Sequence, residues 1–164
     1  MTESLNQTEL SVNKFIKALE KTGKRIEKID AELRKTRSEL EELESRVLDL
    51  SSEMREIERK IHEKLAKIKR TNKKLLKAET DRQIETLDRD LKQLNKALDK
   101  LDRKYARLKE EYDKLIRKEE KLLDKEMKLE EEKARLYHER ELLMQRAEQI
   151  MARLGNRISR IRAL

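Results

Sequence analysis

The sequence has few of the residues that interrupt helices or fill compact cores. It contains no proline, no tryptophan, two glycines, one phenylalanine and three tyrosines. Because proline and glycine break or weaken helices, their scarcity favours long uninterrupted ones. Because aromatic side chains supply much of the buried area of a globular domain, their scarcity argues against a compact core.

Two further absences bear on location and chemistry. The chain has no cysteine, which excludes disulfides and thiolate metal sites. It also has no run of about 18 apolar residues and no apolar signal-peptide core, so we expect a cytoplasmic protein.

Charged residues dominate what is present. Of 164 residues, 48% are charged and 35% are hydrophobic, as is typical of long helices rich in Lys, Glu, Leu and Arg. The net charge of +8 is a small difference between 43 basic and 35 acidic residues. Such mixed charge is typical of the solvated surface of a coiled coil.

Leucine recurs at every seventh position of the second half. This ladder consists of Leu87, Leu94, Leu101, Leu108, Leu115, Leu122, Leu129, Leu136 and Leu143. A seam of this kind lies along one side of a helix and is buried only against another helix. The ladder therefore predicts an all-α coiled-coil protein, with leucine at heptad position d.

The first half carries a second heptad seam between Leu5 and Ile61. Its apolar positions alternate steps of three and four residues, the 3.5-residue period of a left-handed supercoil. Together with the ladder, we assign to the predicted oligomer seam the residues Leu33, Leu40, Leu43, Val47, Leu50 and Ile57.

The period changes between the two seams, where apolar steps of four residues dominate. Two interpretations are open: a rod-like helix that continues through an irregular joint, which we prefer, or an antiparallel helical hairpin that turns near residues 78–81. Thr80 and Gln83 have the spacing of a helix-capping box, which supports the turn. We divide the chain into a coiled coil at 1–61, a basic joint at 62–83, the ladder coiled coil at 84–154 and a basic tail at 155–164.

The apolar stripe of the second half shifts towards its end. Heptad position a becomes charged at Glu119, Glu126, Lys133 and Arg140, whereas position e becomes apolar at Ile116, Leu123, Tyr137, Met144, Met151 and Ile158. A displaced stripe suits three or more helices, or an extra partner. The charges fit both parallel and antiparallel pairing, so the strand direction stays open.

Two opposed charge bands precede the ladder. Residues 39–58 have a net charge of −6 and residues 59–78 a net charge of +8. Such bands favour a staggered overlap of neighbouring rods, although a merely solvated polar face also explains them. As candidates for electrostatic contact with nucleic acid or anionic lipid we name Lys64, Lys67, Lys69, Arg70, Lys73, Lys74, Lys77, Arg157, Arg160 and Arg162.

No catalytic motif accompanies these features. The sequence has no glycine-rich phosphate loop, nucleophile elbow or metal-ligand spacing, so we expect no enzymatic activity, no cofactor and no small-molecule substrate. We expect a structural or scaffolding protein that forms homo-oligomers through its seams and assembles further into filaments, with other helical proteins as further partners. In its size, basic charge and coiled-coil pattern the chain also resembles the small coiled-coil stalk proteins of flagellar and type III export ATPases. This resemblance implies a monomeric antiparallel hairpin as an alternative.

Overall fold

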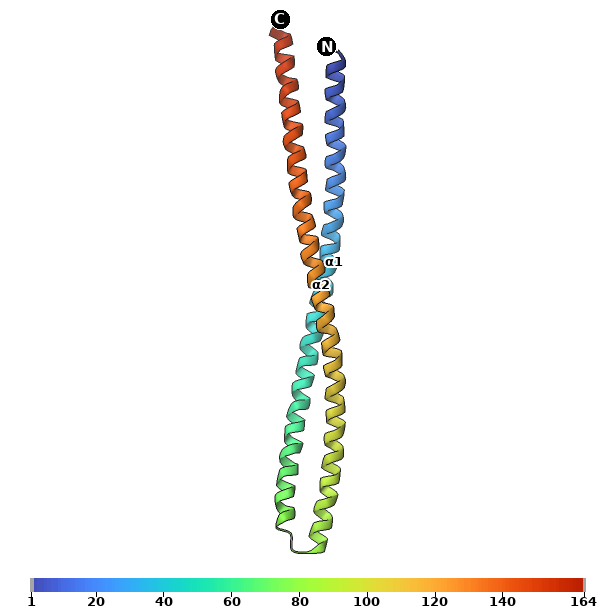
Figure 1. Ribbon diagram of the computed structural model, residues 1–164, viewed down its shortest axis with the longest axis vertical. Coiled ribbons are helices and arrows are strands. Elements are labelled where there is room, and N and C mark those ends of the chain that lie inside the picture. Colours follow the sequence, from blue (N-terminus) through green and yellow to red (C-terminus); the bar gives the residue numbers. More distant parts are fainter. Residues whose placement is uncertain (1, 164) are drawn as a thin grey trace. The chain divides into compact units, whose positions relative to one another are not determined.

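Two long helices form the structure. The computed structural model describes the backbone of residues 2–163 and the side chains of residue 9 and residues 11–156. Helix α1 spans Thr2–Leu76 and helix α2 spans Asp81–Ala163, with no strand among the described residues (Figure 1). The all-α prediction is confirmed.

The chain turns between the two helices. Of the two interpretations of the joint, the turn is observed and the preferred continuous helix is wrong. The amides of Lys77 and Ala78 donate to the carbonyls of Lys74 and Leu75, at 3.1 and 3.2 Å. These bonds to the third preceding residue tighten the end of α1, and the chain then leaves the helix without glycine or proline.

A capping box begins α2. The Thr80 hydroxyl accepts a hydrogen bond from the Gln83 amide at 3.3 Å. In return, the Gln83 side-chain oxygen accepts from the amides of Thr80 and Glu79, at 3.4 and 3.2 Å. Amides that would otherwise lack partners at the start of the helix are thereby satisfied, which makes position 80 a stable place to restart a helix.

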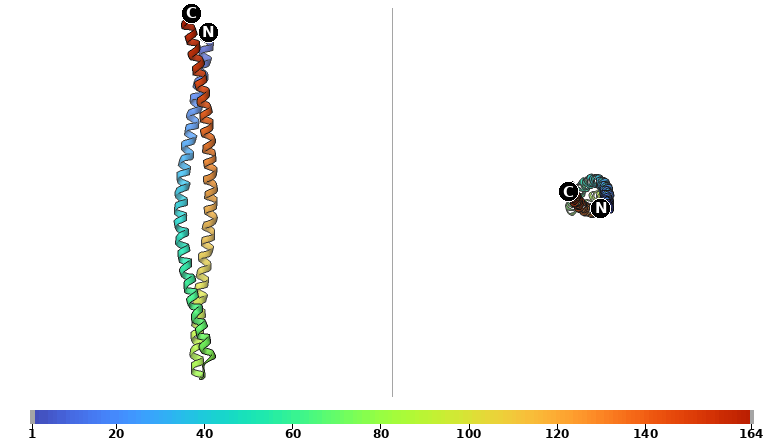
Figure 2. Two further views of the ribbon diagram at one scale, coloured as in Figure 1. Left: turned by 90° about the vertical axis from the view of Figure 1, so that its left-hand side faces the viewer. Right: turned by 90° about the horizontal axis from the view of Figure 1, so that it is seen from above.

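Both helices contribute to each of two compact units. The turn unit comprises Leu40–Lys121, and the terminal unit comprises Met1–Glu39 with Leu122–Leu164. In the turn unit, α1 and α2 lie side by side and antiparallel on either side of residues 77–80 (Figures 1 and 2). In the terminal unit, Asp30 contacts Lys133 and the later residue Arg37 contacts the earlier Glu130, so the segments are again antiparallel.

The core of the terminal unit draws on both helices. It is formed by Ile26, Ile29 and Leu33 from α1 with Leu129 and Leu136 from α2. Leu136 is only 1% exposed, so its side chain is fully enclosed in this core. On the α1 side of the turn unit, the buried apolar side chains are Leu40, Leu43, Leu50 and Ile57.

Two threonines are also buried along the α1 seam. The hydroxyls of Thr22 and Thr36 donate to the carbonyls of Ala18 and Glu32, each at 2.8 Å. Because each hydroxyl bonds within its own helix, its burial leaves no polar atom without a partner.

Helix α2 continues beyond the ladder. It passes through Gly155 and includes the predicted tail as far as Ala163. Among the described residues, neither helix is long and apolar enough to cross a membrane.

Candidate functional site

The predicted seam lies between the helices of one chain. Leu33, Leu40, Leu43, Leu50, Ile57, Leu129 and Leu136 are buried, and Val47, Leu87, Leu94, Leu101, Leu108, Leu115, Leu122 and Leu143 are half-buried. Since this burial arises within a single chain, α1 and α2 cover much of each other's seam.

Ion pairs flank the core of the terminal unit. Lys133 Nζ lies 2.5 Å from Asp30 Oδ1, and the hydrogen bond to this carboxylate raises the pKa of Lys133. Arg37 Nη2 lies 2.9 Å from Glu130 Oε1, and its Nε lies 3.9 Å from Glu126 Oε1. Two of the four charged residues at position a of α2, Glu126 and Lys133, thus have partners on α1.

Polar contacts also join the helices of the turn unit. Arg46 Nη2 lies 2.8 Å from Glu111 Oε1, and the Tyr105 hydroxyl donates to Glu58 Oε1 at 2.7 Å. The hydrogen bond to the carboxylate raises the pKa of Tyr105, because the neutral phenol is the donor. These contacts place residues far apart in sequence opposite one another.

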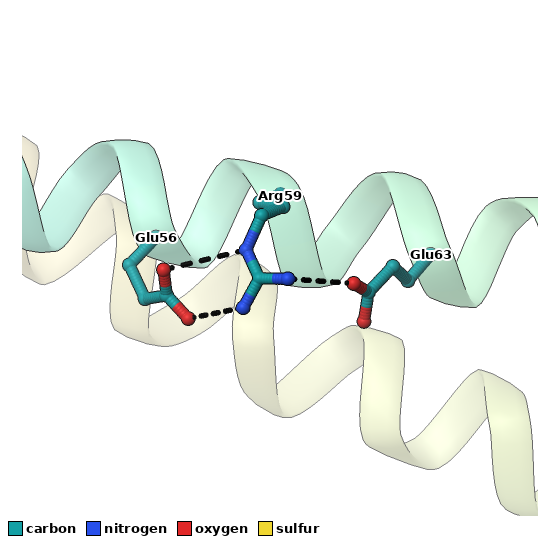
Figure 3. A network of polar contacts seen from close by, with 3 residues as sticks. All are labelled: Glu56, Arg59 and Glu63. Carbon is teal, nitrogen blue, oxygen red and sulfur yellow. Dashed lines mark hydrogen bonds and ion pairs between the residues drawn. The ribbon is translucent and has the colours of Figure 1, made fainter.

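A charge network marks the border between the acidic and basic bands of α1. Arg59 lies between Glu56 and Glu63, with its Nη2 2.6 Å from Glu56 Oε1 and its Nη1 2.9 Å from Glu63 Oε1 (Figure 3). The hydrogen bond and the charge of Arg59 lower the pKa of Glu56, and the same contact raises the pKa of Arg59. The first cation of the basic band is therefore neutralised.

The seven cations of the basic band that lie between residues 64 and 77 are not neutralised in this way. Within the described part of the chain, no ion pair involves the predicted contact residues Lys64, Lys67, Lys69, Arg70, Lys73, Lys74 or Lys77. Lys64 is half-buried and the other six are exposed. Arg157, Arg160 and Arg162, predicted to act with them, lie outside the residues whose side chains are described.

A groove lies beside these cations in the turn unit. It has a volume of about 370 Å³ and is lined from α1 by Lys64, Lys67, Arg70, Thr71 and Lys74, and from α2 by Asp90, Gln93, Leu94 and Ala97. A second hollow of about 480 Å³ adjoins the turn, where Lys74, Lys77 and Arg82 contribute to its lining. The charged residues that line the first groove are four cations and one carboxylate, and this excess of positive charge favours anions.

Apolar side chains remain exposed on α2 of the terminal unit. This α2 stripe consists of Leu123, Met127, Tyr137, Met144 and Met151, which are 40–59% exposed. Four of its members occupy position e, as the sequence indicated, whereas Met127 was missed. The signal for Met127 was its place four residues after Leu123, on the same side of the helix.

Tyr137 in this stripe is held by two cations. Arg140 Cζ lies 4.6 Å and Lys133 Nζ 5.8 Å from the centre of its ring. These cation–π contacts orient an otherwise exposed ring beside a hollow of about 500 Å³ that Met144 also lines. The stripe therefore combines a positioned aromatic ring with flexible apolar side chains.

No group suited to metal binding occurs among the described residues, where no three His, Asp or Glu side chains come together for an ion. No protein-family model matches the chain, and neither the curated proteins nor the solved structures gave a significant match.

Proposed function

We propose that the protein is a structural coiled-coil hairpin that associates with a second copy of itself through the α2 stripe. The observation that carries this proposal is the row of exposed apolar side chains on a helix whose seam is already covered by α1. The seams hold one chain together in this proposal, and the stripe joins chains. We propose that it acts in the cytoplasm, as expected from the sequence.

The spacing of the stripe supports docking of a helix. Leu123, Tyr137, Met144 and Met151 are separated by multiples of seven residues, so they follow one side of a supercoiled helix. From Leu123 to Met151 this side extends about 42 Å at 1.5 Å per residue. Glu130 also occupies position e, but its charge is paired with Arg37.

A second copy is the occupant that fits this surface. It presents an apolar row of identical length, and two hairpins brought together supply the four helices of a bundle. Methionine side chains adapt their shape to a partner surface, which favours their use at such contacts. When two α2 stripes pack together, both partners remove apolar area from water.

Mass in solution tests this proposal. We expect light scattering to give twice the 19.8 kDa chain mass at high concentration. The variant Leu123→Gln/Met144→Gln/Met151→Gln should be a monomer, because its stripe is polar. A wild-type protein that stays at one chain mass at all concentrations would contradict self-association.

A matched control changes exposed leucines away from the stripe. Leu48 and Leu142 are 69% and 44% exposed, and Leu142 lies about 160° around α2 from the e positions, at 100° per residue. The variant Leu48→Gln/Leu142→Gln should associate like the wild type. Equal loss of association in both variants would mean that general hydrophobicity, and not the stripe, causes it.

A stalk-like hairpin of an ATPase or export complex is the second candidate. It is favoured by the antiparallel pairing of α1 with α2 in one chain. In that function the protein is a monomer that inserts into a larger assembly. If the mass stays at that of one chain at all concentrations, the result supports the stalk-like hairpin and contradicts self-association.

A further inference from the structure

We propose that the basic side of α1 in the turn unit binds the phosphate backbone of a double-stranded nucleic acid, independently of base sequence. The residues that carry this site are Lys67, Arg70, Lys74 and Lys77, here called the basic row. The inference is separate from self-association, because the row lies in the turn unit and the α2 stripe lies in the terminal unit.

The basic row is a continuous line of exposed cations. Lys67, Arg70 and Lys74 follow one another at steps of three and four residues, which places them on one side of α1, and Lys77 is the first residue after the helix. From Lys67 to Lys77 the row extends about 15 Å at 1.5 Å per residue. Duplex DNA carries one negative charge per about 1.7 Å of its axis, so a row of this length meets several phosphates.

The basic row lies in a stretch of the chain, residues 64–78, that contains no acidic residue. Like charges three or four residues apart destabilise a helix, whereas opposite charges stabilise it. Elsewhere the chain uses opposite charges at this spacing, as in Asp124 with Lys128 and Glu110 with Lys114. Arg70 and Lys74 have no acidic residue three or four positions away on either side, so a bound polyanion supplies a counter-charge that α1 does not offer there.

The composition of this side of α1 favours nucleic acid over a membrane. Ala66 and Thr71, which border the row on α1, are small, whereas helices that bind membrane surfaces bury large apolar residues on the bound side. The exposed Leu65 and Leu76 lie on the other side of α1, at 100° per residue.

The surroundings of the row favour a duplex over a single strand. No aromatic residue occurs between residues 59 and 101, so no platform exists on which unpaired bases stack. Beside the row, Thr71 and Gln93 line the groove and offer hydrogen bonds to phosphate or sugar oxygens, and Asp90 is its single acidic residue.

Fluorescence anisotropy with a labelled 20-base-pair DNA duplex tests the site at several salt concentrations. Four phosphate contacts predict that log K falls against log salt with a slope of about −3.6. Duplexes of unrelated sequence should bind equally. The variant Lys67→Gln/Arg70→Gln/Lys74→Gln/Lys77→Gln should bind at least about tenfold more weakly and with a shallower slope.

Two further variants serve as controls. Lys104→Gln/Lys109→Gln/Arg117→Gln/Lys118→Gln removes the same charge from exposed positions of α2 in the turn unit and should bind like the wild type. Lys67→Arg/Lys74→Arg/Lys77→Arg keeps the charges and should also bind. Circular dichroism checks that all variants are helical, and light scattering checks that their mass is that of the wild type.

Three results would overturn the proposal. The first is absence of duplex binding at 50 mM salt, and the second is equal loss of binding in the α2 control. The third is binding to phosphatidylserine vesicles without binding to the duplex, which would assign the row to lipid. Light scattering on the same samples reports self-association separately. Loss of duplex binding can therefore be distinguished from loss of self-association.

Discussion

Tyr105 shows how one polar side chain ties the helices of the turn unit together. Its hydroxyl donates to Glu58, and this bond raises the pKa of the phenol above its usual 10.0. Because the folded protein favours the neutral phenol, the bond contributes stability below pH 10. That contribution disappears as the pH rises through the pKa of the folded state.

An ultraviolet titration tests this contact in a protein with a single tyrosine. The background Tyr112→Phe/Tyr137→Phe leaves Tyr105 alone among the three tyrosines. We expect its phenolate to appear with a midpoint above 10.0, and we expect Glu58→Gln to lower that midpoint by removing the charged acceptor. Equal midpoints in the two proteins would show that the hydrogen bond is absent in solution.

Single charged residues also show what the sequence left undecided. The charges at Glu126 and Lys133 indicated that each needed an opposite partner, and both a parallel and an antiparallel neighbour would have supplied one. The structure pairs them with Arg37 and Asp30, which lie on the other helix of the same chain. Heptad position predicts that such a residue lies beside the seam, but only the register of the two helices determines its partner.

The turn is the element that decides the architecture. Thr80 and Gln83 exchange hydrogen bonds at the start of α2. Replacing a threonine at this position by alanine typically costs about 1 kcal/mol. We therefore expect Thr80→Ala to lower the free energy of unfolding by about that amount, measured by urea denaturation followed by circular dichroism.

A conservative change provides the control for the turn. Thr80→Ser keeps the hydroxyl acceptor and should retain nearly all of the wild-type stability. If alanine and serine proved equally stable, the capping box would contribute nothing and the turn would depend on helix pairing alone.

The position of this turn was predictable, but its existence was not. The capping spacing of Thr80 and Gln83, and the steps of four residues before it, indicated an irregular joint. Yet Lys77, Ala78 and Glu79 are all compatible with a helix, so local preference did not exclude a continuous one. What favours the turn is the burial of two seams against each other, a tertiary effect that no local pattern contains.

At the scale of the whole molecule, the same leucine ladder fits a helix of its own chain or of another. The prediction of packed seams thus carried no information on which chain supplies the partner. A connection of four residues between α1 and α2 holds the two seams at a high effective concentration. This proximity favours pairing within the chain over pairing between chains.

Whether the chain folds back on itself can be tested by measuring one distance between the two helices. Spin labels are attached to a variant with Arg46→Cys and Glu111→Cys, which introduces the only two cysteines of the chain. In the wild type these two residues form an ion pair of 2.8 Å and are 65 positions apart in sequence. The hairpin places the labels on adjacent helices, whose axes lie about 8–10 Å apart. A continuous helix separates them by about 98 Å.

Labelled protein is then mixed with an excess of unlabelled protein, and the mixture is unfolded and refolded. This dilution distinguishes pairing within a chain from pairing between chains. We predict a short distance between the labels that persists unchanged in a large excess of unlabelled chain. Loss of the short distance on dilution would mean that antiparallel partners come from different chains. Its absence from the undiluted sample as well would mean that the helices do not pair in this register, and either result would contradict the hairpin.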